Sequence, residues 1–227
     1  MSHSYVIADT RTMNMLAPTA FLKRTRMGCT AVVLALGLPG CQAASVQPPA
    51  CADATYYFPA DSFPRHYPAS DAQRRLRYAT PLARLGEPSL SCGHAVNAQS
   101  YRLLWLNGQA HPVVIRITRT EDVISLHAFQ LSGWGATDPG RLTAYSHRRL
   151  TEAEWHRLQT ALIGADFWRL PTSGNLYGIH GGQWVIEGND RGRYHLVDRW
   201  SPTAGAYRAL GDLFFELTGW TKPYPNQ

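Results

Sequence analysis

Lysine, long apolar runs and the usual catalytic motifs are scarce or missing in this sequence. The only lysines are Lys23 and Lys222, and arginine supplies the rest of the 22 basic residues. The longest apolar run near the N-terminus, residues 30–38, has about ten residues, whereas a helix needs roughly 20 to cross a bilayer. We therefore expect no permanent transmembrane helix.

Motifs for nucleophilic or metal-dependent catalysis are also missing. The chain has no GxSxG and no CxxC, and its nine histidines form neither HxH nor HExxH. The glycines of residues 174–182 are not followed by a lysine, so they do not indicate a phosphate-binding loop. The sequence thus predicts no catalytic residue, no metal site and no cofactor, and it leans against an enzyme without excluding one.

The formal charge of +6 is unevenly distributed along the chain. Residues 1–40 hold four basic residues and one acidic residue, so the rest of the chain has a net charge of only +3. No long basic run or mixed basic and aromatic pattern accompanies this small excess. We therefore expect no nucleic acid as a partner.

Residues 1–40 have the layout of a secretory signal. A positive cluster at residues 23–26 precedes the apolar run, and small residues follow from Gly40 onward. We expect this segment to be a signal peptide that is removed on export.

Residues 38–41, Leu-Pro-Gly-Cys, resemble the lipobox of bacterial lipoproteins. The resemblance implies that Cys41 becomes the lipidated first residue, and that residues 41–50 form a linker between the membrane anchor and the domain. Gln42 follows the cysteine, which by the sorting rule of enteric bacteria implies the periplasmic face of the outer membrane. Cleavage after Ala43 is the open alternative, and it would give a soluble periplasmic or secreted protein.

Two further cysteines remain once Cys29 leaves with the signal and Cys41 takes lipid. Cys51 and Cys92 would then share an oxidising compartment, where disulfides persist. We predict a disulfide between them that pins an N-terminal segment, residues 51–99. The bridge would close a loop of 41 residues, which corresponds to roughly 4 kcal/mol of stabilisation in the chain-entropy picture.

Hydrophobic periodicity predicts the first elements of the domain. A short helix is expected over residues 70–78, because Ser70 suits its N-cap and Pro81 follows shortly. A hairpin turn is expected at Glu121-Asp122. Strands are predicted over residues 101–106, 111–118, 123–131 and 141–146.

Two further helices are predicted near the C-terminus. Thr151 and Glu154 have the spacing of a capping box, and the apolar stripe that follows predicts a helix to about residue 165 that lies on a sheet. A last helix is expected over residues 207–217, with Gly219 as its stop. Together these elements predict an α+β core over residues 100–220 and a tail over residues 221–227. We expect an antiparallel sheet of about six strands with two helices packed on one face.

Residues 183–200 have the alternating pattern of a hairpin around Asn-Asp-Arg-Gly. A three-residue turn with Gly192 in the left-handed conformation would place Glu187 opposite His195. One face would then be buried, with Trp184, Ile186, Tyr194 and Leu196. The other face, mostly polar, would hold Gln183, Glu187, His195 and Arg199.

The predicted polar face has three interpretations. A carboxylate beside a histidine raises the imidazole pKa and orients the ring, as a general base or a ligand requires. A cross-strand pair of glutamate and histidine is also ordinary on a solvated sheet. The structural interpretation is favoured, a binding surface comes second, and catalysis is third.

The closing strand also carries a resemblance to a known family. Residues 192–202 read Gly-Arg-Tyr-His-Leu-Val-Asp-Arg-Trp-Ser-Pro. Together with residues 184–188, the strand over 101–106 and the helix from Thr151, they resemble a family of exported bacterial proteins, many of them lipoproteins, that end in G-x-Y-H-x-V-x-R-W-S-P followed by a helix. The resemblance covers about residues 75–220 and implies no activity.

From these observations we expect an envelope-tethered lipoprotein that binds protein without catalysis, as an inhibitor or immunity protein does. Its expected partners are the membrane, through the lipid anchor, and a protein in the periplasm. One alternative is an enzyme that acts on envelope glycans or peptides through Glu187 and His195. Another is a purely structural lipoprotein.

Overall fold

The computed structural model describes residues 57–63, 70–92, 97–134, 138–174 and 181–221. All of them belong to one unit, Val46–Gln227. The predicted signal peptide, the lipidation site Cys41, the linker and Cys51 lie outside the described residues. The disulfide between Cys51 and Cys92 therefore stays a prediction, as does the identity of the anchor.

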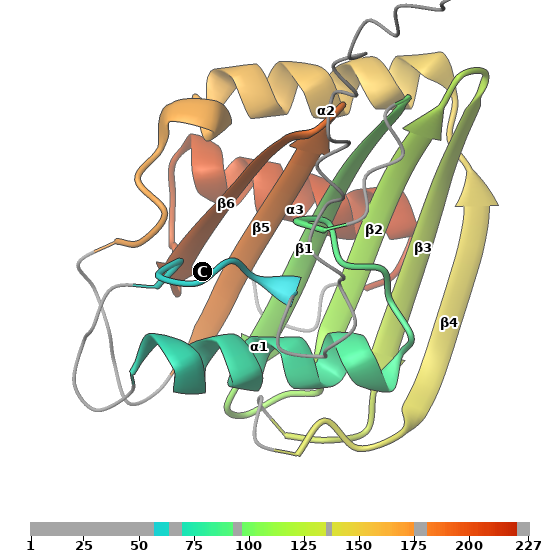
Figure 1. Cartoon of the computed structure of the whole chain (residues 1–227). Helices are drawn as coiled ribbons and strands as arrows, with labels where there is room; N and C mark the ends of the chain where they lie inside the picture. Colours follow the sequence, from blue (N-terminus) through green and yellow to red (C-terminus); the bar gives the residue numbers. More distant parts are fainter. Residues whose placement is uncertain (1–56, 64–69, 93–96, 135–137, 175–180, 222–227) are drawn as a thin grey trace, which may run out of the picture. The chain divides into compact units, whose positions relative to one another are not determined.

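Six antiparallel strands form one sheet in the order β4-β3-β2-β1-β5-β6 (Figure 1). The strands are β1 (Ala98–Asn107), β2 (Val113–Thr120), β3 (Val123–Leu131), β4 (Leu142–Arg149), β5 (Gly182–Asp190) and β6 (Arg193–Trp200). The helices are α1 (Asp71–Arg84), α2 (Glu152–Gly164) and α3 (Ala206–Thr218), with a short 3-10 helix, η2 (Phe167–Arg169). The predicted α+β class and the six-stranded antiparallel sheet are confirmed, and so is the turn at Glu121-Asp122, because Thr120 pairs with Val123.

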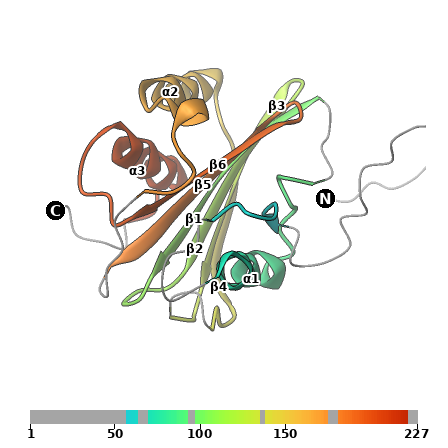
Figure 2. The ribbon, with the colours of Figure 1, turned by 60° about the vertical axis from the view of Figure 1, so that its left-hand side comes forward.

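Helices α2 and α3 pack together on one face of the sheet, as the sequence predicts (Figure 2). At the start of α2, the Glu154 amide donates to the Thr151 hydroxyl at 3.2 Å, and the Thr151 amide donates to the Glu154 carboxylate at 2.8 Å. The stripe of Trp155, Leu158 and Leu162 is buried. Leu103 and Trp105 of β1 belong to the hydrophobic core between these helices and this face of the sheet.

Helix α1 covers part of the opposite face. The predicted N-cap at Ser70 is confirmed and forms a capping box with Gln73, but the helix is longer than predicted, because it continues through Pro81 to Arg84. A proline inside a helix costs about 3 kcal/mol. That cost is offset because the last turns bury Tyr78, Ala79 and Leu82 in a second apolar cluster with Phe58, Phe63, Leu104, Val114, Val185 and Leu196.

The turn between β5 and β6 differs by one residue from the prediction. Asp190 pairs with Arg193, so the turn has two residues, Arg191 and Gly192, with φ of 52° and 98°. Two-residue turns with both residues at positive φ match the right-handed twist of the flanking strands. The side chain of Asn189 accepts the Gly192 amide at 2.9 Å and helps to hold this turn.

The shorter turn shifts the pairing register and changes the faces of β6. Glu187 lies opposite Leu196, whereas His195 lies opposite Gly188. A slip of one residue moves a strand's side chains to the other face. The predicted polar face is therefore wrong, and so is the predicted buried face, because Trp184 and Ile186 lie with α2 and α3 while Leu196 lies with α1.

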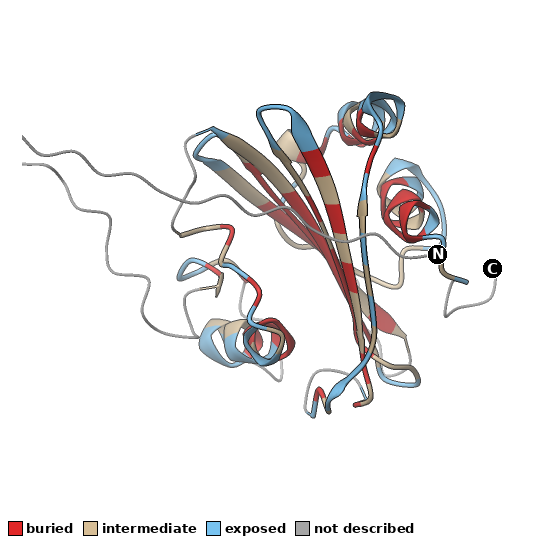
Figure 3. Ribbon diagram, turned by 90° about the vertical axis from the view of Figure 1, so that its right-hand side faces the viewer, coloured by how far each residue is buried: buried red, intermediate tan, exposed pale blue. Residues whose placement is uncertain are grey.

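Burial follows this two-sided packing (Figure 3). Buried residues run along the middle strands, whereas β4 at the edge alternates between exposed and half-buried residues. Among the described residues, no helix combines the length and the apolar character needed to cross a membrane.

Candidate functional site

The four residues predicted to share a polar face are divided between the two sides of the sheet. Gln183 and Glu187 lie on the side of α1, and His195 and Arg199 lie on the side of α2 and α3. Glu187 is fully buried. The structure therefore does not bring Glu187 and His195 together as an acid–base pair.

His195 and Arg199 hold the segment after η2 against β6. The His195 ring packs edge-on to Phe167 at 5.2 Å between centroids, and its Nε2 lies 3.0 Å from the Leu170 carbonyl oxygen. Burial lowers the pKa of His195. Arg199 donates to the carbonyls of Pro171 and Thr172 at 2.8 and 3.1 Å. Both side chains thus have structural partners.

Glu187 belongs to a buried ionic network on the α1 side. Its Oε1 accepts from Nε and Nη2 of Arg102 at 2.9 and 2.7 Å, and its Oε2 accepts from the Tyr194 hydroxyl at 2.9 Å. Glu187 and Arg102 are both 0% exposed. Burial raises the pKa of Glu187, and the neighbouring Arg102 guanidinium opposes that effect.

The network continues into the segment that follows α1. Glu87 is 5% exposed, and its Oε2 accepts from Arg116 Nε at 2.9 Å. Arg102 also donates to the Pro88 carbonyl at 2.7 Å, and Asn189 donates to the Leu90 carbonyl at 2.8 Å. These bonds fix residues 87–90 across the strands and over the buried charges. We read the network as a structural clamp.

Sequence reasoning missed this clamp, although a signal was present. Arg102 is the second residue of the otherwise apolar run 101–106. A buried arginine needs a charged partner, so an arginine in such a strand indicates a buried carboxylate beside it.

On the same face of the sheet as α1, the part formed by β3 and β4 carries a cluster of rings instead of buried charges. We call it the open patch, and define it as His127, Phe129, Tyr145 and His147. The two histidines stack with ring centroids 4.4 Å apart, and Phe129 lies 5.1 Å from Tyr145. His127 Nδ1 lies 3.1 Å from the Tyr145 hydroxyl.

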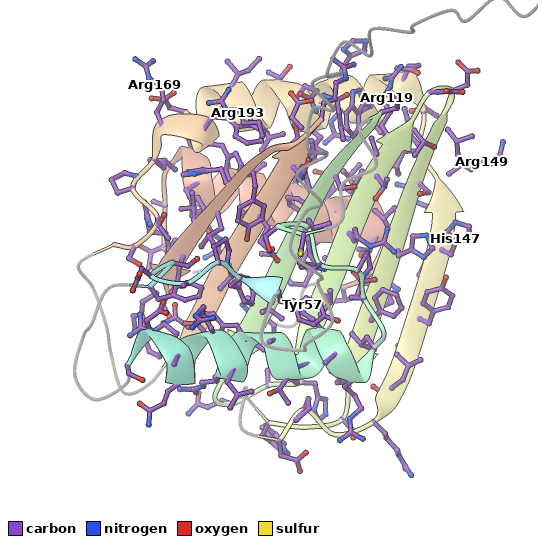
Figure 4. All side chains as sticks on the ribbon, in the orientation of Figure 1. Tyr57, Arg119, His147, Arg149, Arg169 and Arg193 are labelled. Carbon is purple, nitrogen blue, oxygen red and sulfur yellow. The ribbon has the colours of Figure 1, made fainter. Side chains whose placement is uncertain are left out.

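The open patch is accessible to solvent at the edge of the sheet. Tyr145 is 52% exposed, and His147 is also exposed. Figure 4 shows His147 and Arg149 along the outer strand, away from Tyr57 and the covered part of the sheet. Alternation along β3 and β4 places all four members of the patch on the same side.

Positive charge surrounds the open patch. Arg149 follows His147 by two residues on β4, and Arg116 lies opposite His127 on β2. Arg116 is engaged by the Glu87 carboxylate at 2.9 Å. Partial burial and the neighbouring Arg116 lower the pKa of His127.

The backbone of β4 is also open on its outer side. Leu150 donates to the Ile124 carbonyl at 2.9 Å, which sets the alternation of the ladder between β3 and β4. By this alternation the amide and carbonyl of Tyr145 and His147 point away from β3. No residue that the structure describes bonds to these four groups.

The other edge of the sheet is partly covered. The Asp198 amide of β6 donates to the Thr172 carbonyl at 2.6 Å, and the Gly174 amide donates to the Asp198 carbonyl at 3.3 Å. A short bridge between Ser173 and Asp198 therefore covers β6 at this residue. Within the described ranges, no such bridge forms on the outer side of β4.

A hollow of a different character lies on the other side of the sheet. A shallow groove of about 980 Å³ runs between α2 and α3. Arg157 and Glu216 pair across it at 2.7 Å, and Trp220 lies at one end. Across the residues that the structure describes, no group of three or more His, Cys, Asp or Glu side chains is placed to hold a metal ion.

Comparison with known proteins gives no relative, because neither any family model nor any curated protein matches this chain.

Proposed function

We propose that this chain is an exported binding protein, tethered to the cell envelope through Cys41, whose binding surface is the open patch. The observation that carries the proposal is the exposure of clustered aromatic and imidazole rings beside an unpaired strand edge. Aromatic side chains are enriched in protein interfaces, where they contribute a large contact area.

The contrast with the buried clamp supports a binding role for the patch. Arg102, Glu87 and Glu187 are buried and engaged by protein groups, which favours a structural role for them. The rings of the open patch keep exposed surface on the same side of the sheet. The enzymatic alternative loses its geometric support, because Glu187 and His195 lie on opposite sides.

Two features of the sequence support export and tethering. The positive and apolar segments before residue 40 have the order of a signal peptide. The Leu-Pro-Gly-Cys sequence resembles a lipobox, and the likeness of residues 192–202 to exported bacterial proteins agrees with it.

The binding role is tested by photocrosslinking in intact cells. A photoreactive phenylalanine analogue would replace Tyr145, and the matched control would carry it at Ile163, which is 78% exposed on α2. We expect a discrete crosslinked protein from position 145 and none from position 163. The same set of products from both positions would contradict a specific surface at the patch.

The tether is tested by metabolic labelling with a clickable palmitate analogue. We expect the wild-type chain to take up label and to fractionate with membranes, and Cys41→Ala to lose both properties. An unlabelled, soluble wild-type chain would overturn the anchor and leave the binding surface to be judged by crosslinking alone.

A further inference from the structure

We propose that the outer edge of β4 takes an extended, acidic segment of a partner protein as a seventh strand. This inference rests on the proposed binding role of the open patch, and it adds the form and the charge of the partner. The mode of recognition is strand addition, in which main-chain hydrogen bonds give affinity and alternate side chains give selectivity.

The main chain of β4 provides the first reason. Tyr145 and His147 are two residues apart and direct their amides and carbonyls away from β3. An extended strand offers donors and acceptors at the same repeat of about 6.8 Å. A short partner strand therefore satisfies all four groups at once.

The side chains of the same two residues provide the second reason. Tyr145 and His147 carry the outer half of the open patch, and they contact Phe129 and His127 behind them. Directly opposed residues on paired antiparallel strands have Cβ atoms about 4.5–5.5 Å apart. Alternate side chains of an added strand would thus rest on the rings of the patch.

Charge decides which kind of strand fits. Residues 141–149 contain three arginines and no acidic residue. Arg148 is paired with Glu154 of α2 at 2.7 Å, which leaves the charge of Arg141 and Arg149. Opposite charges on neighbouring strands are stabilising, and like charges directly opposite are destabilising. A second copy would bring the same arginine-rich strand to the edge, so an acidic partner segment is favoured over self-pairing.

The arginines also explain how an open edge is kept free of self-association. Charged side chains on an edge strand discourage pairing with identical strands. The opposite edge differs, since residues 172–174 cover β6 at Asp198. No described segment covers β4 in this way.

The test uses defined peptides and the chain without its signal. An eight-residue peptide that alternates glutamate with valine is compared with the lysine–valine peptide and with a glutamate peptide N-methylated at alternate amides along the pairing edge. Binding is followed by NMR titration, and hydrogen exchange reports on single amides. N-methylation removes donors from the peptide alone, so it leaves the folding of the protein unaffected.

We expect the glutamate peptide to bind at least about tenfold more tightly than either control peptide, a difference of about 1.4 kcal/mol. The amides of Tyr145 and His147 should gain protection, whereas those of Ala144 and Ser146 already bond to β3 and should change little. His147→Pro removes an outward donor at a position where an edge strand tolerates proline, and it should weaken binding more than His147→Ala.

Several results would overturn the inference. Equal affinity for the N-methylated peptide would exclude strand addition, and equal affinity for the lysine peptide would exclude acidic selectivity. Protection of the same amides by rising protein concentration, without peptide, would identify a second copy as the occupant. If position 145 gives a discrete crosslink in cells but the purified chain binds no peptide, the proposed binding role stands and only strand addition is rejected. If there is neither a crosslink nor peptide binding, both the binding role and strand addition are rejected.

Discussion

The two faces of the sheet are built by different interactions, and β1 displays the contrast within a few residues. Leu103 and Trp105 point into the apolar core under α2 and α3, whereas Arg102 and Leu104 point toward α1. Apolar packing accepts many combinations of similar volume. A buried ion pair demands a particular partner in a particular place, so the α1 side specifies how its covering segment docks.

The α1 face is itself divided in the same way. Its part over β1, β5 and β6 is closed by α1 and by residues 87–90, whose carbonyls and carboxylate complete the clamp. In its part over β3 and β4, Tyr145 and His147 of the open patch are exposed, and His127 and Phe129 are half-buried. Stability and recognition are thus assigned to neighbouring regions of one surface, and substitutions should separate them.

The largest loss of stability is expected from Arg102→Ala. This change leaves Glu187 buried without its charged partner, which should lower the free energy of unfolding by about 3–5 kcal/mol. Urea denaturation measures it. The double variant Arg102→Met with Glu187→Leu should recover most of the loss, because a well-packed apolar pair can replace a buried ion pair. A single variant as stable as the wild type would mean that the clamp contributes nothing.

A matched pair on β1 compares the apolar parts of the two faces. Leu103 and Leu104 are both 0% exposed and point to opposite sides. Each replacement by alanine should lower the free energy of unfolding, measured by urea denaturation, by about 2–5 kcal/mol. A loss below about 1 kcal/mol for Leu104→Ala alone would indicate that α1 is only loosely docked.

A pH-dependent effect is expected at Asp198, which α1 covers. Burial raises the pKa of Asp198 to about 7, although Arg74 at 3.9 Å and the Tyr78 hydroxyl at 3.2 Å oppose this. The folded state therefore holds its proton over a pH range in which the unfolded chain has lost it. As pH rises from about 4 to about 7, the wild type should lose up to about 1.4 kcal/mol per pH unit relative to Asp198→Asn.

Unfolding of both proteins at several pH values checks this prediction. Titrating histidines affect the two proteins alike, so the difference between them isolates Asp198. A constant difference across that range would mean that the folded protein ionises Asp198 at its ordinary pKa.

Removal of the α1 cap should have a smaller effect. Ser70→Ala deletes the hydroxyl that accepts the Gln73 amide at 3.2 Å, and we expect a loss of about 1 kcal/mol. Thr151→Ala at the equivalent position of α2 is the comparison. Similar losses in the free energy of unfolding, measured by urea denaturation, would mean that both helices depend on their caps to the same degree. No loss for Ser70→Ala would mean that the cap does not stabilise α1.

The smallest effect on stability is expected in the open patch. Tyr145→Ala should change the free energy of unfolding by no more than about 0.5 kcal/mol, because the side chain is 52% exposed. The same variant should lose the partner seen by crosslinking from a neighbouring position such as His147. A large loss of stability would mean that Tyr145 stabilises the folded protein and does not serve mainly in binding.

Local features were predictable from the sequence because they depend on near neighbours. The cap at Thr151 and the turn at Glu121-Asp122 are set by residues a few positions apart. The cap at Ser70 was likewise predictable, but the end of α1 was not, because burial of Leu82 carries the helix past Pro81. The open patch was missed, because nothing in β3 or β4 alone says that they meet or that helices leave them uncovered.

The sequence by itself determined the class of fold, the helix starts and the alternation of the strands, since each depends on periodicity and local hydrogen bonds. Tertiary structure decided which faces those strands present. Glu187 can be buried because Arg102 of β1 lies directly opposite it. The two-residue turn at Arg191 and Gly192 gives β5 and β6 a pairing register that is compatible with this long-range pair. The order of strands placed β4 at the edge, and only that placement makes its aromatic and imidazole side chains a surface.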